Sequence, residues 1–185
     1  MRILLAHNSL YYPSFGGGDK SNRLLMEALA ARGHAVQVVA RIAKFGAEEH
    51  TRFLIELETR GVSPKVTGEA VRFALNGVDV HTLTLNPQLR AYFSEQLTRF
   101  DPDVILTSTD DPAQLLFDVA SRAQRARVVY LVRATIAAPF GPDSSGPNRA
   151  KTEMLRHADG IVGVSEYVAG YVRQWSGLDA IHVPI

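Results

Sequence analysis

The sequence predicts an α/β protein in which helices cover both faces of a mainly parallel sheet. Short apolar runs alternate with helical segments along the chain, and runs that are apolar on both faces are typical of buried parallel strands. The first forty residues already read as strand, helix and strand, which implies a right-handed crossover between parallel strands. Asn76-Gly77 adds a strong local indication of an antiparallel hairpin. We therefore expect a Rossmann-like three-layer sandwich with six or seven strands.

The individual elements follow from apolar periodicity, capping residues and turn residues. A strand at residues 1–6 precedes a helix that we expect to begin at Asp19, a good N-cap residue, and to end at Gly33. Pro87 opens a later helix that runs to about residue 100, and Asp111-Pro112 starts another that runs to about residue 124. The other expected strands are 35–40, 71–75, 78–85, 103–107, 128–132, 160–164 and 180–183, and the other expected helices are 47–60, 148–157 and 166–176.

Size and composition restrict the class of protein. A chain of 185 residues fits one domain with a sizeable core. The net charge of +1 argues against a dedicated nucleic-acid binder, and the absence of cysteine excludes disulfides and cysteine-bound metals. The first apolar run is too short for a signal peptide, and no segment approaches the length of a membrane span. We expect a soluble, cytoplasmic protein, and no feature of the sequence supports membrane contact.

Three consecutive glycines, Gly16, Gly17 and Gly18, close the loop after the first strand. They lie at a helix N-terminus, where free N–H groups and the helix dipole favour an anion. The dinucleotide fingerprint does not fit, because Ser21 takes the place of its third glycine, the loop is too long, and Arg41 follows the second strand where an acid is expected. The phosphate-binding P-loop pattern is also absent. The alternative is that the glycines only allow the chain to turn, although three exceed what a turn requires.

Several segments together resemble a known family. The opening segment reads HNSLYYPSFGGGDKSNRLLMEALAARGHAVQVVA and includes the element Arg-Gly-His-x-Val at residues 32–36. The motif DPDVI follows at residues 101–105, and ADGIVGVSE follows at residues 158–166. In this order and spacing they resemble the N-terminal domain of GT-B-fold glycosyltransferases of the large retaining family 4. His34, within the first element, is interpreted as a turn residue after the helix cap rather than a ligand contact.

The resemblance implies a two-domain enzyme of which residues 1–185 are the single N-terminal, acceptor-side domain. The C-terminal donor-binding domain of this family carries two glutamates at E-x7-E spacing, and it usually begins after a segment similar to His182-Val183-Pro184-Ile185. The chain would then be an expressed fragment, or a natural half that pairs with a separate chain. The implied substrates are a nucleotide sugar and a hydroxyl acceptor. No cofactor and no metal are implied, because the leaving phosphate is thought to assist the acceptor hydroxyl.

The resemblance also suggests roles for residues that follow strands. The backbone N–H groups of the glycines would approach the donor diphosphate or the transferred sugar. Ser108, Thr109 and Asp110 follow a buried strand, at the end where ligands bind in open α/β sheets. Asp110 is a candidate to orient or deprotonate the acceptor hydroxyl, and the alternative is a helix N-cap. Arg133 stands where many relatives have a histidine that contacts the sugar, and we expect it to bind a phosphate or carboxylate.

Other candidates have equally plausible structural roles. Arg133 has the alternative of pairing with Asp110 or Asp143. His7 follows the first strand and is a candidate acceptor contact or a hydrogen-bonded structural residue. Glu166 is a candidate substrate contact, or it joins Ser165 in capping the next helix. Three aromatic residues of the first loop are candidates to stack on a sugar or to anchor the loop, namely Tyr11, Tyr12 and Phe15. The loop at residues 139–147 is expected to border the cleft and to move when the acceptor binds.

Two other functions remain as alternatives to a glycosyltransferase. A non-catalytic sugar- or phosphate-binding or regulatory subunit would use the same fold without transfer. A nucleotide-dependent oxidoreductase is disfavoured by Ser21, Arg41 and the length of the first loop.

Overall fold

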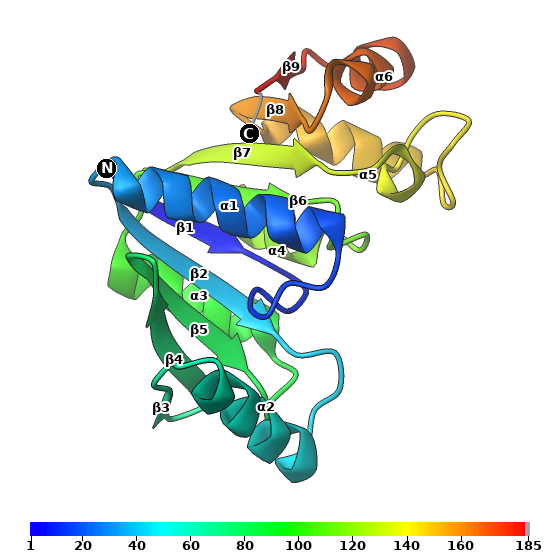
Figure 1. The fold of residues 1–185 in the computed structure, drawn as a ribbon. Helices are drawn as coiled ribbons and strands as arrows, with labels where there is room; N and C mark the ends of the chain where they lie inside the picture. The colour runs from blue at the N-terminus through cyan, green and yellow to red at the C-terminus, as the bar shows by residue number, and fades with distance from the viewer. Residues whose placement is uncertain (184–185) are drawn as a thin grey trace. The chain divides into compact units, whose positions relative to one another are not determined.

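The computed structural model describes residues 1–183, and the chain divides into two compact units, Met1–Asp101 and a second that begins at Pro102. Figure 1 shows the order of the elements along the chain. The expected start of an interdomain connection at residues 182–185 falls partly outside the described residues.

The first unit contains β1 (Arg2–Ala6), α1 (Gly17–Ala31), β2 (Ala35–Arg41), α2 (Ala47–Thr59), β3 (Lys65–Thr67), β4 (Ala70–Leu75), β5 (Val78–Leu83) and α3 (Leu89–Phe100). Its strands lie in the order β3-β4-β5-β2-β1. Strand β2 is parallel to both β1 and β5, whereas β4 is antiparallel to both β5 and β3. The carboxyl ends of β1, β2 and β5 therefore lie at one edge of this part of the sheet.

The hairpin predicted from Asn76-Gly77 is confirmed. Asn76 and Gly77 both have positive φ, 48° and 83°, which is the conformation that a two-residue type I′ turn requires. The hairpin is more than a local insertion, because β5 also pairs in parallel with β2. The turn thus extends the sheet toward β4 and the short edge strand β3.

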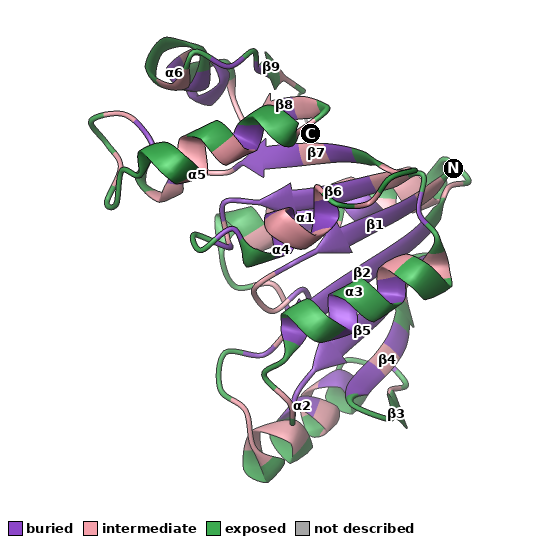
Figure 2. Ribbon diagram, turned by 180° about the vertical axis from the view of Figure 1, so that it is seen from behind, coloured by how far each residue is buried: buried purple, intermediate pink, exposed green. Residues whose placement is uncertain are grey.

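Helices α1 and α3 cover opposite faces of the first unit's strands, as the views from the two sides show (Figures 1 and 2). The strands carry side chains that are almost completely buried, including Leu4, Leu5, Val38 and Val39. Met26 of α1 and Phe93 of α3 pack against them with no exposed surface. Full burial of each such side chain contributes about 1.5–3 kcal/mol, so the helices are held chiefly by their apolar faces.

Two boundaries in the first unit differ from the sequence expectation. Helix α1 begins at Gly17 with Gly16 as its N-cap, so Asp19 lies inside the first turn and is not the N-cap. Asp19 does not cap the helix because its carboxylate instead lies against the ring of His7, a residue distant in the sequence. Helix α3 begins at Leu89, two residues after Pro87, because Asn86 accepts a hydrogen bond from the Gln88 N–H and forms a turn first.

The second unit contains β6 (Val104–Ser108), α4 (Leu115–Ala120), β7 (Arg127–Val132), the 3₁₀ turn η1 (Thr135–Ala137), α5 (Arg149–Met154), the 3₁₀ turn η2 (Leu155–His157), β8 (Gly160–Gly163), α6 (Glu166–Ser176) and β9 (Ile181–His182). Its strands are parallel and lie in the order β6-β7-β8-β9. Helix α6 has the predicted bounds. The Ser165 hydroxyl caps it by accepting a hydrogen bond from the Val168 N–H.

Helix α4 is much shorter than the expected helix from Asp111 to about residue 124. Gln114 adopts a left-handed conformation with φ of 57°, so the chain turns again before the helix begins at Leu115. The helix expected at 148–157 is likewise divided, because α5 tightens into the 3₁₀ turn η2.

The predicted fold class is confirmed, since the described residues form mostly parallel strands that alternate with helices. They contain nine strands rather than six or seven, and the short edge strand β3 is the one that had no counterpart among the expected strands. Among the described residues, no helix combines the length and the apolar character needed to cross a bilayer.

Candidate active site

The glycine turn lies beyond the carboxyl end of β1 and forms the start of α1. Gly16, Gly17 and Gly18 are exposed, and no side chain caps the helix at Gly16. The first backbone hydrogen bond of the helix joins the Lys20 N–H to the Gly16 carbonyl oxygen at 2.9 Å. The N–H groups of Gly17 and Gly18 precede that bond and therefore have no acceptor within the helix. A Cβ at Gly17 would meet no atom within 4 Å, so the protein's own packing does not require glycine there.

His7 connects β1 to this turn. Its ring is completely buried, with Nε2 at 3.2 Å from the Asp19 Oδ1 atom and Nδ1 at 3.1 Å from the side-chain nitrogen of buried Asn22. An amide N–H₂ group can only donate, so Nδ1 accepts this hydrogen bond and the proton of a neutral ring lies on Nε2, facing Asp19. His7 is thus placed to position the first turn of α1, which corresponds to its structural alternative.

Asp19 is ionised in this environment. Burial alone would raise the pKa of its carboxyl group, but hydrogen bonds from the side chains of His7 and Ser9 and from the Gly16 backbone hold that pKa below its ordinary value. The carboxylate therefore adds one negative charge beside the glycine turn. The next residue, Lys20, is exposed and adds one positive charge.

The three aromatic residues of the first loop take different positions. Tyr11 is fully buried and its hydroxyl group lies 3.4 Å from the Arg23 carbonyl oxygen, so it anchors the loop to α1. The ring of Tyr12 packs against Phe73, with 6.5 Å between the ring centroids. Phe15 is 78% exposed and is the one of the three that presents its side chain to solvent.

The second unit brings together Ser108, Thr109, Asp110 and Arg133. Ser108 and Thr109 are almost completely buried at the end of β6, and the Ser108 hydroxyl donates a hydrogen bond to the Asp110 carboxylate. The backbone N–H of Arg133 donates a hydrogen bond to the Thr109 hydroxyl oxygen at 3.0 Å. The backbone N–H of Thr109 donates one to the Leu131 carbonyl oxygen at 3.1 Å. These contacts fix the ends of β6 and β7 side by side.

The helix-capping alternative for Asp110 is taken by its neighbour Asp111. The Asp111 carboxylate accepts a hydrogen bond from the Leu116 N–H at 2.7 Å, at the start of α4. Burial raises the pKa of the Asp111 carboxyl group, and the Leu116 N–H partly opposes that effect. Asp111 therefore supplies the side-chain bond at the start of α4.

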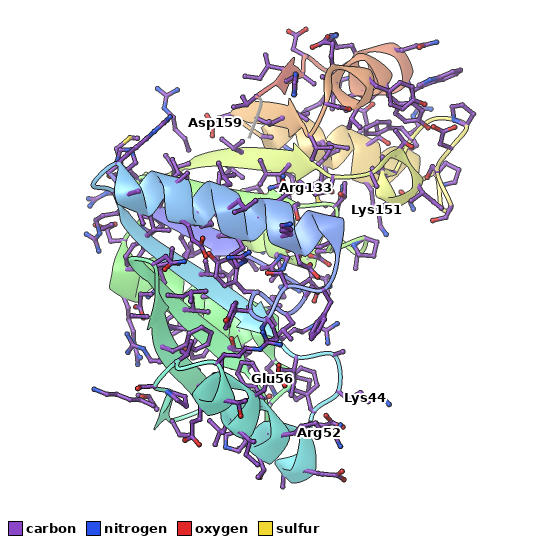
Figure 3. All side chains as sticks on the ribbon, in the orientation of Figure 1. Lys44, Arg52, Glu56, Arg133, Lys151 and Asp159 are labelled. Atoms are coloured by element: carbon purple, nitrogen blue, oxygen red, sulfur yellow. The ribbon has the colours of Figure 1, made fainter. Side chains whose placement is uncertain are left out.

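Two cations lie at this edge (Figure 3). Arg133 follows β7, and burial lowers its pKa to about 10 while the negative charge of Asp110 raises it, so the guanidinium group stays charged at neutral pH. Asp110, one of the two acids considered as partners of Arg133, acts on its charge in this way. Lys151 of α5 donates a hydrogen bond from Nζ to the Pro112 carbonyl oxygen at 2.7 Å, in the loop after β6. An acid and two cations thus surround the loops that follow these strands.

The comparison with known families decides the classification. A family model described as a glycosyl transferase 4-like domain matches residues 16–184. The chain belongs to the glycosyl transferase 4-like family. No curated protein matches the chain in a sequence search.

Solved structures support the fold assignment of this glycosyl transferase 4-like domain. The apo structure of OtsA is 12% identical with a TM-score of 0.52, and the match covers 92% of this chain and 42% of OtsA. The trehalose 6-phosphate synthase from Burkholderia multivorans is 11% identical with a TM-score of 0.52, covering 100% of this chain and 48% of that protein. At such identities the likeness concerns the fold. The chain spans less than half the length of each neighbour.

Glu166 has contacts of its own on α6. It is exposed in the first turn of α6, forms an ion pair with Arg173, and lines a cavity of about 370 Å³ with Tyr167 and Trp175. In the glycosyl transferase 4-like domain the preceding residue, Ser165, is the cap. Glu166 itself is at the surface, where it is paired with Arg173.

The loop at residues 139–147 is held by Tyr171 of α6. The Tyr171 hydroxyl donates a hydrogen bond to the Phe140 carbonyl oxygen at 3.2 Å and accepts one from the Asp143 N–H at 2.9 Å. Gly141 has a φ of 81°, and a Cβ at this position would clash with the Tyr171 side chain. The expected movement of this loop would have to break these contacts.

Sequence reasoning missed Lys151 and the different roles of the two adjacent acids. Lys151 occupies an ordinary helical position, and no motif distinguishes it from other surface lysines. Asp110 and Asp111 are the same residue type at consecutive positions, and only the backbone path after β6 determines that Asp111 bonds to the start of α4 while Asp110 accepts from Ser108. His34, interpreted as a turn residue, lies 3.5 Å from the amino group of Met1 through its Nδ1 atom.

Proposed function

We propose that this chain is the acceptor-binding half of a retaining glycosyltransferase, which transfers a sugar from a nucleotide-sugar donor to a hydroxyl acceptor. Membership of the glycosyl transferase 4-like family supports transfer in general. The observation that carries the finer proposal is the cluster of Asp110 and Arg133 where β6 and β7 end, the edge at which open α/β sheets bind ligands.

In this proposal Asp110 binds the acceptor hydroxyl. Its carboxylate already accepts a hydrogen bond from Ser108, and a carboxylate has lone pairs for a second donor. An acceptor hydroxyl that donates to Asp110 is oriented for attack on the anomeric carbon, and its proton passes to the departing phosphate oxygen or to Asp110 as the new bond forms.

Arg133 stabilises negative charge in this proposal. A side chain whose pKa is about 10 cannot act as a base at neutral pH, but its partly buried positive charge strengthens the attraction to an anion. The donor's diphosphate gains charge as the glycosidic bond breaks. A fixed cation beside it lowers the energy of the transition state.

The glycine turn is proposed to bind the donor diphosphate or the transferred sugar through the N–H groups of Gly17 and Gly18. Their exposure and the open space at Gly17 support close approach of a ligand to the backbone. His7 and Asp19 act on this turn as positioning residues. No metal is proposed, because the leaving phosphate itself is proposed to assist the acceptor hydroxyl.

A partner half is proposed to supply donor recognition. The chain spans 42% and 48% of the two neighbours, so a second domain of similar size, or a separate chain, fits the proposal. The 185-residue chain alone is then expected to transfer little or no sugar.

The test uses the natural full-length gene product and measures transfer from a panel of nucleotide sugars. Asp110→Asn and Arg133→Met are each expected to lower kcat about a hundredfold or more, since each removes a charge from the reacting edge. Asp118→Asn and Arg122→Met are matched controls, because Asp118 on α4 and Arg122, two residues after that helix, form an ion pair at the surface of the same unit. They are expected to leave kcat within about twofold of the wild type.

The outcomes separate the proposal from its alternative. Equal activity of the two variant pairs would contradict the roles of Asp110 and Arg133. A gene product that binds a sugar or phosphate and regulates another chain, yet transfers nothing with any donor, would instead be the non-catalytic subunit.

A further inference from the structure

Arg41 carries a positive charge in the first unit that the proposed transfer does not use. It is the last residue of β2, and Asn8 follows the neighbouring parallel strand β1 by two residues. Both therefore lie at the carboxyl edge of these strands, where α/β sheets bind ligands. We propose that Arg41, assisted by Lys44, binds a phosphate or carboxylate group of the acceptor. That this anion belongs to the acceptor rests on the proposed function.

Neutral groups hold the guanidinium group of Arg41 in place. Its Nε atom donates a hydrogen bond to the Asn8 Oδ1 atom at 2.8 Å, and Nη1 donates one to the Ile42 carbonyl oxygen at 3.3 Å. The centre of the Phe45 ring lies 5.7 Å from Arg41 Cζ, within the range of a cation–π contact. These contacts order the side chain before a ligand arrives, so that binding an anion costs little further side-chain entropy.

No acid neutralises this charge. Arg41 forms no ion pair with a carboxylate among the described residues. The other half-buried arginines of the first unit each pair with an acid, namely Arg2 with Asp101, Arg23 with Glu27 and Arg72 with Asp79. A partly buried charge without a counter-charge is unfavourable, so the arrangement around Arg41 favours an anion from outside the chain.

The remaining N–H donors of Arg41 are accessible to a ligand. A guanidinium group has more donors than the contacts with Asn8 and Ile42 use. Its Nη2 atom makes no hydrogen bond with the described residues and is not enclosed by them. Nη1 and Nη2 together present the paired N–H groups that bind two oxygens of a phosphate or carboxylate.

Lys44 adds a second positive charge in the loop after β2. It is exposed, directly precedes Phe45, and forms no ion pair within the described part of the chain. Figure 3 shows its side chain extending away from this loop. The acids that follow in the sequence, Glu48 and Glu49, both pair with Arg52 on α2. The loop between β2 and α2 therefore carries an excess of positive charge, which favours an anionic ligand over a neutral one.

Inorganic phosphate is the probe for the anion site. The 185-residue chain is titrated at constant ionic strength, and the NMR signals of the Arg41 Nε–H group and of the Lys44 and Phe45 backbone are expected to move and to saturate. Arg41→Gln keeps a side-chain N–H but removes the charge, and it is expected to weaken binding about tenfold or more. Arg32→Gln is the matched control, because Arg32 is an exposed arginine after α1 in the same unit, and it should leave binding within about twofold.

Two measurements on the natural full-length gene product assign the anion to the acceptor or to the donor. Phosphate is titrated again after saturation with a nucleoside diphosphate, and it is expected to bind as before because the donor occupies a different site. Transfer is also measured to sugars supplied in neutral, 6-phosphate and uronate forms. The charged forms are expected to have the lower KM. Arg41→Gln is expected to raise that KM about tenfold or more and to change the donor KM less than about twofold.

The outcomes distinguish the anion site from the proposed function. Shifts that are absent or linear, or equal binding by the wild type and Arg41→Gln, would overturn the anion site. Displacement of phosphate by the nucleoside diphosphate, or equal KM values for neutral and charged acceptors, would overturn its assignment to the acceptor. Absence of transfer with every donor would overturn the proposed function and this assignment together, whereas saturating phosphate binding would still support the anion site.

Discussion

The Nε2 atom of His7 lies 3.2 Å from the Oδ1 atom of Asp19, and this contact joins the residue after β1 to the first turn of α1. Because the His7 ring is completely buried, the surrounding atoms hold its orientation and it cannot rotate freely. The contact therefore fixes where α1 begins and how its glycines are presented.

The first prediction concerns the charge of Asp19. At neutral pH, Asp19→Asn is expected to lower the free energy of unfolding by about 1 kcal/mol, because the amide cannot replace the carboxylate in all its hydrogen bonds. The native pKa of Asp19 is lowered, so its contribution is present above the ordinary value of 3.8 and is lost as pH falls through the native pKa.

Urea unfolding of the wild type and Asp19→Asn across that pH range measures the effect. The two free energies should converge in acid. Glu48→Gln, which alters an exposed acid on α2, is the control and should change little at any pH. A difference that persists unchanged in acid would show that the charge of Asp19 is not the cause.

The second prediction concerns the glycine under Tyr171. Gly141→Ala is expected to lower the free energy of unfolding by about 2–3 kcal/mol, since φ is 81° and the new Cβ would lie 2.2 Å from the Tyr171 hydroxyl oxygen. Gly146→Ala is the matched control in the same loop, because a Cβ there meets nothing within 4 Å and φ is not positive. Equal stability of the two variants in chemical denaturation would refute this account of the loop.

The third prediction separates two adjacent acids. Asp111→Ala is expected to lower the free energy of unfolding by about 1 kcal/mol through loss of the bond to the Leu116 N–H, with transfer activity retained by the folded fraction. Asp110→Asn is expected to do the reverse and to lower activity with little change in stability. Denaturant unfolding and transfer rates, measured on both variants of the full-length protein, check this. If Asp111→Ala abolished transfer in folded protein, the division of roles would be wrong.

Local patterns in the sequence were sufficient to predict much of the fold. Asn76-Gly77 specified its hairpin because both residues accept positive φ, and Ser165 specified the start of α6 through its own hydroxyl. Such features depend on neighbours in the chain. They can therefore be recognised without knowledge of the tertiary structure.

The site was less predictable because its contacts are non-local. Asp19 is a residue type that often caps helices. Its partner here is His7, which follows β1, and Gly16 is the N-cap instead. Arg133 and Asp110 were proposed as site residues from their places after strands, and their roles remain predictions. The contact of Lys151 with Pro112, and the takeover of the capping role by Asp111, depend on how the loops after β6 fold back.

The most direct test of the central claim is the stereochemistry of transfer. The natural full-length gene product is supplied with nucleotide sugars and acceptor hydroxyls, with and without a metal chelator, and the anomeric configuration of the first product is read by NMR. The account predicts a product with the same configuration as the donor, formed at the same rate when the chelator is present. An inverted product, or no transfer with any donor, would contradict it.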